Sequence, residues 1–198
     1  MTSGPDEARR RAFWQEQFAL ATDPRAWWLS ARRLMQASEL LWKAFDADLK
    51  AMRSGKPGHT LDNLETGLAW MLLTGLALEN LAKAVLLKRN PSVARPGRLP
   101  KWPGDGHDLN RLFSHAVIGI GADEREMLER LTEFVRWRGR YPIPGNYSAM
   151  LPRSSVPGGG TPYMMPTTDH GMAVNLFDRL SKLLEITDDT VSNRLKDE

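Results

Sequence analysis

The stretch that decides the fold is LDNLETGLAWMLLTGLALENLAKAVLLKR, which runs from Leu61 to Arg89. Its apolar side chains occur on nearly every side of a helical repeat, and Thr60 stands before it as a suitable N-cap. A helix that is apolar all round is surrounded by other elements, so this one is predicted to be the central helix. Gly67 and Gly75 lower its helix propensity, which a close approach by neighbouring helices would explain. Its charge-free part, Thr66 to Leu78, is shorter than the roughly 20 residues that cross a bilayer, so we expect no membrane segment.

Other helices are predicted on both sides of this stretch. Asp23 followed by Pro24 is a helix start signal, since aspartate caps the first turn and proline suits its first position. The segment Gly139 to Pro166 is rich in proline and glycine and predicts a long irregular loop, which in a compact domain is usually functional or mobile. The remaining predicted helices are Asp6–Leu20, Pro24–Met52, His107–Val117, Asp123–Arg138, a helix capped by Thr167 or Thr168 that ends at Glu185, and a short one within Asp188–Glu198.

Size and composition fit one folded domain. The chain has 198 residues, of which 41% are hydrophobic and 26% are charged, and it contains no cysteine. These values predict a single all-α domain over residues 1–198 with its core at about 24–186, built as a bundle of about five main helices. The polar start, Met1 to Arg11, is not a secretory signal, and the lack of cysteine fits a reducing compartment, so we expect a soluble cytoplasmic protein.

Several chemistries lack their usual residues. The four histidines (His59, His107, His115 and His170) include no pair at the four-residue spacing that places two metal ligands on one helix face. The chain has no Gly-x-Ser-x-Gly turn and no phosphate-binding glycine loop. We therefore expect no metal site and no cofactor.

Charged residues inside the central helix form one candidate feature. Glu79 and Lys83 are four residues apart with the acid first, a spacing at which they can pair on one helix face. Charge on a buried helix needs partners, and Arg140 or His107 are candidates. The pattern is compatible both with a structural network and with a site lined by these groups.

Two short motifs add further candidate residues. In Gly106-His107-Asp108-Leu109, Asp108 is placed either to cap a helix or to line a site. In the segment Arg136-Trp137-Arg138-Gly139-Arg140-Tyr141-Pro142-Ile143-Pro144, a helix stops at a glycine. Its arginines can grip phosphate while an aromatic ring stacks on a base, or Arg140 can anchor the loop by bonding helix carbonyls. The predicted ligand-binding residues are Glu79, His107, Asp108, Arg136, Arg138, Arg140 and Tyr141.

The chain resembles an uncharacterised bacterial branch of the HEPN-like proteins over about Ala26 to Leu184. The resemblance rests on the order of the helices and on these two motifs, the first of which is followed by Leu112. The resemblance implies a helical bundle, a homodimer with its site at the dimer interface and, in many members, metal-independent RNA cleavage in phage defence or toxin–antitoxin pairs. In that family an arginine is followed after four to six residues by a histidine. No histidine follows Arg136, Arg138 or Arg140 at this interval.

The expected function is therefore binding of RNA or a nucleotide, without catalysis. A second possibility is a protein-interaction module, such as an antitoxin or scaffold partner. The chain has seven tryptophans, and Trp14, Trp27, Trp28 and Trp102 exceed the obvious needs of one bundle core, while tryptophan is enriched at interfaces. A third possibility is a metal-independent endoribonuclease, in which His107 or His115 would replace the missing histidine in space.

Overall fold

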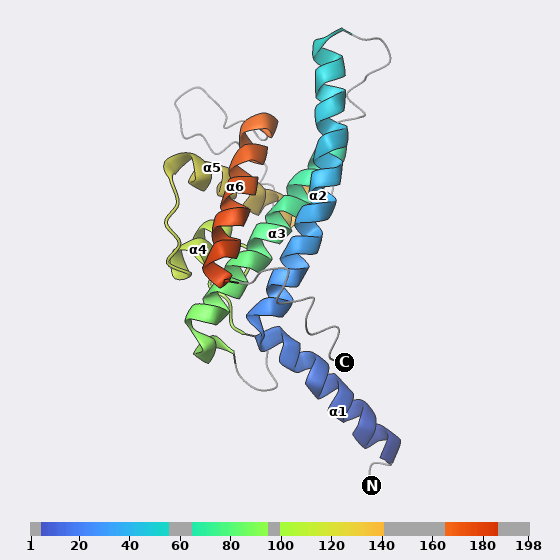
Figure 1. The fold of residues 1–198 in the computed structure, drawn as a ribbon, viewed down its shortest axis with the longest axis vertical. Helices are drawn as coiled ribbons and strands as arrows, with labels where there is room; N and C mark the ends of the chain where they lie inside the picture. The colour runs from blue at the N-terminus through green and yellow to red at the C-terminus, as the bar shows by residue number, and fades with distance from the viewer. Residues whose placement is uncertain (1–4, 56–64, 95–99, 141–164, 186–198) are drawn as a thin grey trace.

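The computed structural model of the chain describes residues 5–55, 65–94, 100–140 and 165–185. Every regular element in these ranges is a helix, and none of them contains a strand, which confirms the predicted all-α bundle. The elements are α1 (Pro5–Ala19), η1 (Leu20–Thr22), α2 (Pro24–Arg53), α3 (Glu65–Arg89), η3 (Pro91–Val93), α4 (Leu109–His115), α5 (Ala122–Glu133), η4 (Phe134–Arg138) and α6 (Pro166–Leu184). Figure 1 shows α2, α3 and α6 running along the body, with α4 and α5 at its side.

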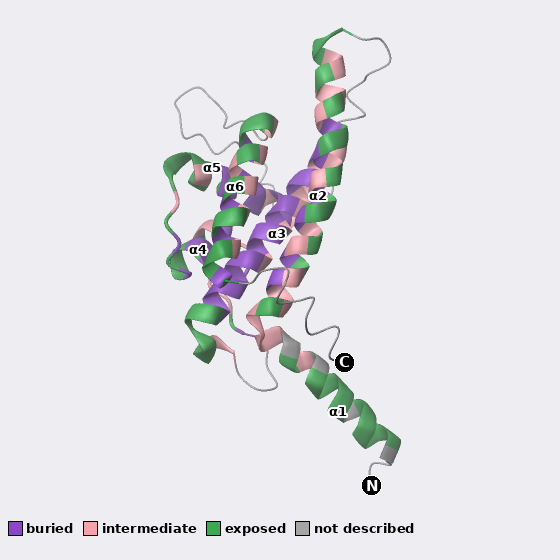
Figure 2. Cartoon of the chain, viewed as in Figure 1, coloured by how far each residue is buried: buried purple, intermediate pink, exposed green. Residues whose placement is uncertain are grey.

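The central position predicted for α3 is confirmed. It packs against α2, α4, α5, η4 and α6, and most of its side chains from Ala77 to Leu87 are inaccessible to solvent. Figure 2 shows the buried residues gathered along α3 and along the sides of the helices that face it. By length and composition alone Thr66–Arg89 could cross a membrane, but 78% of its most apolar window is buried inside the protein. This helix therefore forms the core of the bundle.

The two glycines of α3 lie where neighbouring side chains come close, as predicted. A Cβ atom on Gly67 would lie 2.7 Å from Cζ of Phe45 in α2. A Cβ atom on Gly75 would lie 2.6 Å from Cγ2 of Val135 in η4. The missing side chains let α2 and η4 approach α3 closely.

Helix α2 begins as the sequence predicts. The carboxylate of Asp23 accepts a hydrogen bond from the backbone N–H of Arg25 at 2.9 Å, and Pro24 occupies the first helical position. Its stripe of buried residues, which includes Trp28, Trp42 and Phe45, packs on α3. Trp28 thus belongs to the core, and the prediction that it exceeds the needs of one bundle core is wrong.

Two predicted helices differ from those observed in their ends. The helix expected over His107–Val117 is shorter, because Asp108 caps it by accepting from the N–H of Arg111 at 3.1 Å, and Val117 has a positive φ of 53°. The helix expected over Asp123–Arg138 changes type at Phe134, where one turn of π-helix replaces the α-helix. In that turn the N–H of Gly139 donates to the carbonyl of Phe134, five residues back.

The predicted cap of the last helix is wrong. Neither Thr167 nor Thr168 caps α6, which begins at Pro166 with Met165 before it. Asp169 takes the capping role in part, because its Oδ2 accepts from the N–H of Met165 at 3.2 Å. The same carboxylate forms a bidentate ion pair with Arg130 of α5, and both side chains are buried. This pair fixes the start of α6 on the bundle.

Other sequence predictions lie outside the described residues. They are the Thr60 cap, the start of the central helix at Leu61, the loop from residue 141 to 164, and the short helix within Asp188–Glu198.

Helix α1 extends away from the body as an arm. Figure 1 shows it leaving the bundle at the end where α2 begins. The side chains of Phe13 and Trp14 are 53% and 67% exposed, and their rings pack edge to face at 5.3 Å. This helix therefore presents aromatic surface that no part of the described bundle covers.

Candidate functional site

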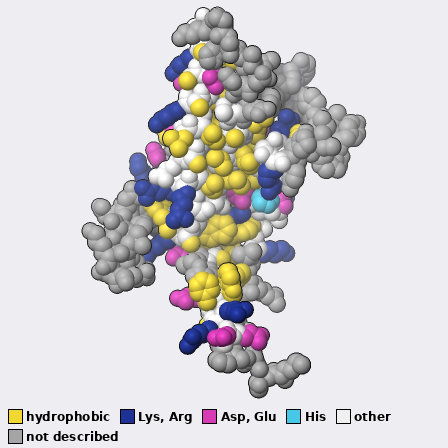
Figure 3. All heavy atoms as spheres, turned by 90° about the vertical axis from the view of Figure 1, so that its right-hand side faces the viewer, with side chains coloured by type: hydrophobic (Ala, Val, Ile, Leu, Met, Phe, Trp, Pro, Cys, Tyr) yellow, Lys and Arg dark blue, Asp and Glu magenta, His cyan; other side chains and the backbone are white. Residues whose placement is uncertain are grey.

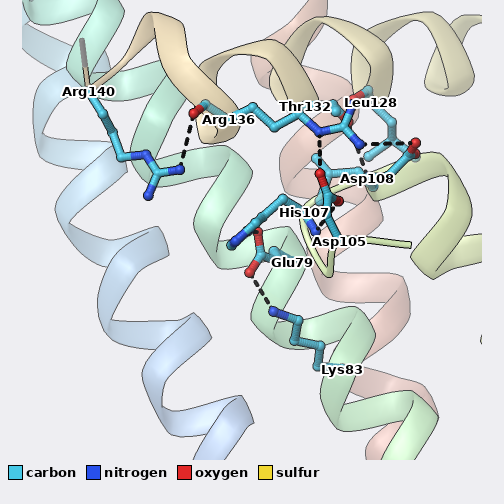
Figure 4. Close-up of polar contacts among 10 residues, drawn as sticks. Glu79, Lys83, Asp105, His107, Asp108, Leu128, Thr132, Arg136 and Arg140 are labelled. Atoms are coloured by element: carbon cyan, nitrogen blue, oxygen red, sulfur yellow. Dashed lines mark hydrogen bonds and ion pairs between the residues drawn. The ribbon is translucent and has the colours of Figure 1, made fainter. Parts of the chain in front are cut away.

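Four of the predicted site residues meet between α3, the loop before α4, and η4. Glu79 lies on α3, His107 and Asp108 immediately precede α4, and Arg136 lies in η4. Figure 4 shows these side chains, together with Asp105, directed toward one another. We call Glu79, Lys83, Asp105, His107 and Arg136 the Glu79 cluster.

The centre of the cluster is a buried ion pair. The Lys83 Nζ atom donates to Oε1 of Glu79 at 2.6 Å, and the two side chains are only 6% and 5% exposed. The ammonium also lies 5.4 Å from the ring centre of Trp27 and 5.3 Å from that of Trp102. The predicted pairing of Glu79 with Lys83 is thus confirmed, and two aromatic rings stabilise the cation in addition.

Glu79 also orients His107. The Nδ1 atom of His107 lies 3.0 Å from Oε2 of Glu79. A carboxylate oxygen accepts, so Nδ1 is the donor of this hydrogen bond and Nε2 is the nitrogen left for another partner. The His107 side chain is 39% exposed, and Nε2 forms no hydrogen bond with any residue that the structure describes. A buried carboxylate therefore holds an imidazole whose second nitrogen is open to a ligand.

Asp105 joins this imidazole to Arg136. Its Oδ1 atom accepts the backbone N–H of His107 at 3.0 Å, and its Oδ2 atom accepts from Nε of Arg136 at 2.9 Å. Burial alone would raise the pKa of Asp105, but the hydrogen bonds from Arg136 and from the His107 amide, together with the positive charge of Arg136, hold it below the ordinary value of 3.8. Asp105 therefore remains ionised and fixes the guanidinium beside the imidazole.

Asp108 mainly holds the start of α4 in place. Its Oδ1 atom caps α4, and its Oδ2 atom lies 3.5 Å from Nη2 of Arg136. The start of α4 is held a second time, because the N–H of Leu109 donates to Oγ1 of Thr132 at 3.1 Å. These contacts attach the loop that carries His107 to α5.

The other two arginines point elsewhere. The Nε atom of Arg138 donates to Glu133 at 2.7 Å, and its guanidinium lies over the ring of Trp137 at 4.6 Å. Arg140 donates to the backbone carbonyl of Arg136 at 3.1 Å, which is the loop-anchoring alternative. Glu79 takes His107 as its second partner and does not contact Arg140. Tyr141 lies outside the described residues.

The predicted ligand-binding residues omit four residues of this region. Lys83 had a signal, the four-residue spacing from Glu79, and Asp105 stands two residues before His107. Trp27 and Trp102 had none, because only the packing of α2 against α3 and the loop before α4 brings both rings to Lys83.

A shallow hollow of about 250 Å³ adjoins the cluster. It is lined by Ala21, Ala26, Trp27, Ser30 and Asn80. Trp27 contacts Lys83, and Asn80 follows Glu79 on α3, so the hollow lies next to the buried ion pair. Within the described ranges, no group of three or more acidic or histidine side chains is arranged to hold a metal ion.

No protein-family model matches the sequence, and no curated protein or solved structure matches it either.

Proposed function

We propose that the protein binds RNA or a nucleotide at the Glu79 cluster. The observation that carries this proposal is the pairing of His107 with buried Glu79 beside an arginine that Asp105 fixes in place. An imidazole with a free nitrogen and a guanidinium at its side suit a phosphate and a ribose hydroxyl. Arg136 is 34% exposed, and its 3.5 Å contact with Asp108 is at the limit of a hydrogen bond, so Nη2 can turn to a phosphate.

The hollow beside Trp27 favours a nucleotide as the ligand rather than a simple anion such as phosphate. An indole face is a platform on which any base can stack, and Ser30 and Asn80 offer polar groups at the edge. In this arrangement the base occupies the hollow and the phosphate approaches His107 and Arg136. The homodimeric state, the cytoplasmic location, and a role in phage defence or a toxin–antitoxin pair, all predicted from sequence, belong to the same proposal.

Cleavage is the enzymatic version of this proposal. A histidine oriented by a carboxylate is the arrangement that general acid–base catalysis uses, and an adjacent arginine stabilises charge that develops on phosphate. His107 therefore takes the place of the histidine that does not follow the arginines in sequence. We retain metal-independent endoribonuclease activity as an alternative to binding alone.

One experiment separates binding from cleavage. Purified protein is incubated with end-labelled RNA, with and without EDTA, and retention and cleavage are scored together. We expect retention that weakens with salt and falls at least about tenfold in His107→Ala and in Arg136→Ala. Matched controls are His115→Ala, an exposed histidine on α4, and Arg138→Ala, whose side chain is held by Glu133.

The outcomes are distinct. Cleavage that survives EDTA and is lost in His107→Ala identifies a nuclease. Retention that is the same in both site variants and in their controls removes the Glu79 cluster from the proposal. An absence of both retention and cleavage removes RNA as the ligand.

A protein-interaction module is the second candidate function. Of the tryptophans that suggest it, Trp27 and Trp102 enclose Lys83, and Trp14 is exposed beside Phe13. Exposed aromatic pairs of this kind are typical of interface hot spots. A stable protein complex on pull-down, lost when Trp14 becomes alanine and free of nucleic acid, is the expected result.

A further inference from the structure

The outer side of the α2–α3 pair carries an apolar strip without charge. On α2 it consists of Leu34, Ala37 and Leu41, and on α3 of Ala69, Leu73 and Leu76. None of these side chains is fully buried. We call these six residues the α2–α3 strip, and Figure 3 shows hydrophobic side chains gathered in a column on this side of the molecule.

Two hydrogen bonds establish that the halves of the strip lie side by side. Asn80 of α3 donates to Oγ of Ser30 of α2 at 3.1 Å at one end of the strip. The hydroxyls of Ser38 and Thr74 lie 2.6 Å apart and are buried beneath it. Because the helices are antiparallel, Leu34 then lies next to Leu76, and Ala37 next to Leu73. The strip is therefore one continuous surface that extends from the hollow at Trp27.

Helix α1 offers the complementary surface. It is 15 residues long, is joined to α2 through the three-residue η1, and packs against η1. Its rings Phe13 and Trp14 are exposed, and no described part of the bundle covers them. Since α1 extends away from the bundle, it does not reach the strip of its own chain.

We propose that α1 of one copy docks on the α2–α3 strip of a second copy, and that each copy receives the arm of the other. This inference rests on the second candidate function, interaction through the exposed aromatic pair, and names a second copy of the chain as the partner. A two-fold axis near η1 places both arms at once, because α1 leaves each bundle at the end where its strip begins.

The dimensions agree with this arrangement. A helix of 15 residues is about 22 Å long, and the strip from Leu34 to Leu41 measures about 10 Å along α2, so the part of α1 that carries Phe13 and Trp14 can cover the strip without entering the hollow at Trp27. With side chains of roughly 200 Å² each, the exposed parts of Phe13 and Trp14 provide about 240 Å² per arm. Two arms with two strips of similar area then bury roughly 1,000 Å², close to what a specific interface requires.

The exchange of α1 between two copies is tested by light scattering after size-exclusion chromatography, over a range of protein concentrations. We expect a dimer whose dissociation constant rises at least about tenfold in the double variant Phe13→Ala, Trp14→Ala and in Leu76→Lys. Leu183→Lys, at a partly exposed leucine of α6, is the matched control and leaves the dimer unchanged. Far-UV circular dichroism confirms that each variant keeps its helices.

Cross-linking identifies the contact, because the natural chain has no cysteine. A tagged Ala12→Cys variant is mixed with an untagged Ala37→Cys variant and oxidised. We expect a disulfide between tagged and untagged chains that depends on Trp14. Three results would overturn the exchange of arms. They are a monomer at all concentrations, a dimer that the Phe13→Ala, Trp14→Ala change does not affect, and capture of a different protein by a monomer. None of these results bears on RNA retention by the Glu79 cluster.

Discussion

The buried ion pair of Glu79 and Lys83 gives the sharpest prediction for stability. Lys83→Met keeps the length of the side chain and removes the ammonium, which leaves a carboxylate buried with His107 as its remaining partner. Removing one member of a buried ion pair typically costs about 3–5 kcal/mol, and the remaining partner places this case near about 3 kcal/mol. Loss of the contacts with Trp27 and Trp102 acts in the same direction.

The measurement is urea unfolding followed by far-UV circular dichroism, arranged as a double-mutant cycle. The variants are Lys83→Met, Glu79→Gln and the double variant, in which we expect a loss smaller than the sum of the single losses by about 1–3 kcal/mol. Lys50→Met is the matched control, because Lys50 pairs with Asp46 at the same four-residue spacing but is 72% exposed. The control loss is expected below about 1 kcal/mol. Equal losses for Lys83→Met and Lys50→Met would refute the reasoning from burial.

Two further predictions concern packing and pH. Gly67→Ala places a Cβ atom 2.7 Å from the ring of Phe45 and is expected to lower the free energy of unfolding by about 1–3 kcal/mol. Gly171→Ala, whose Cβ atom would meet nothing within 4 Å, is expected to raise it by about 0.5–1 kcal/mol. Thermal unfolding of both variants measures the contrast, and melting temperatures shifted alike would contradict it. The lowered pKa of Asp105 means that its contribution to stability is present above its ordinary value of 3.8 and is lost as the pH falls through the lower pKa of the folded protein. Asp105→Asn should therefore lose stability less steeply than the natural protein between about pH 4 and pH 2, as urea unfolding at a series of pH values would show, and identical slopes would exclude this role.

Local signals predicted much of the fold. The pair Asp23-Pro24 predicts the start of α2 because capping and a fixed proline φ act within a few residues. The near-continuous apolar character of α3 predicts its central position, since only a surrounded helix can bury all sides. The cap at Asp108 is of the same kind, and its contact with Arg111 is three residues away in sequence.

Contacts between distant segments were beyond sequence reasoning. The sequence allows either Arg140 or His107 as a further partner of Glu79. His107 is the partner because the loop before α4 lies against α3, a long-range contact that the sequence does not specify. The cap of α6 is not one of the predicted threonines, because Asp169 binds Arg130 and the Met165 amide together, an arrangement that only the packing of α5 on α6 creates. The place of Trp28 in the core is of the same kind, since its burial follows from the packing of α2 on α3 and not from its neighbours in sequence.

The π-helical turn at Phe134–Arg138 sets the direction in which its own side chains, Arg136 among them, leave the helix. Leu128 and Leu131 of α5 stay in the core, while the extra residue in this turn rotates Gly139 and Arg140 by about 100° relative to a continuous α-helix. Deleting one residue there would restore the shorter period and move Arg140 away from its contact with the carbonyl of Arg136. Insertions and deletions in this turn would therefore also change the direction of the Arg136 side chain within it, which point substitutions of similar size could not do.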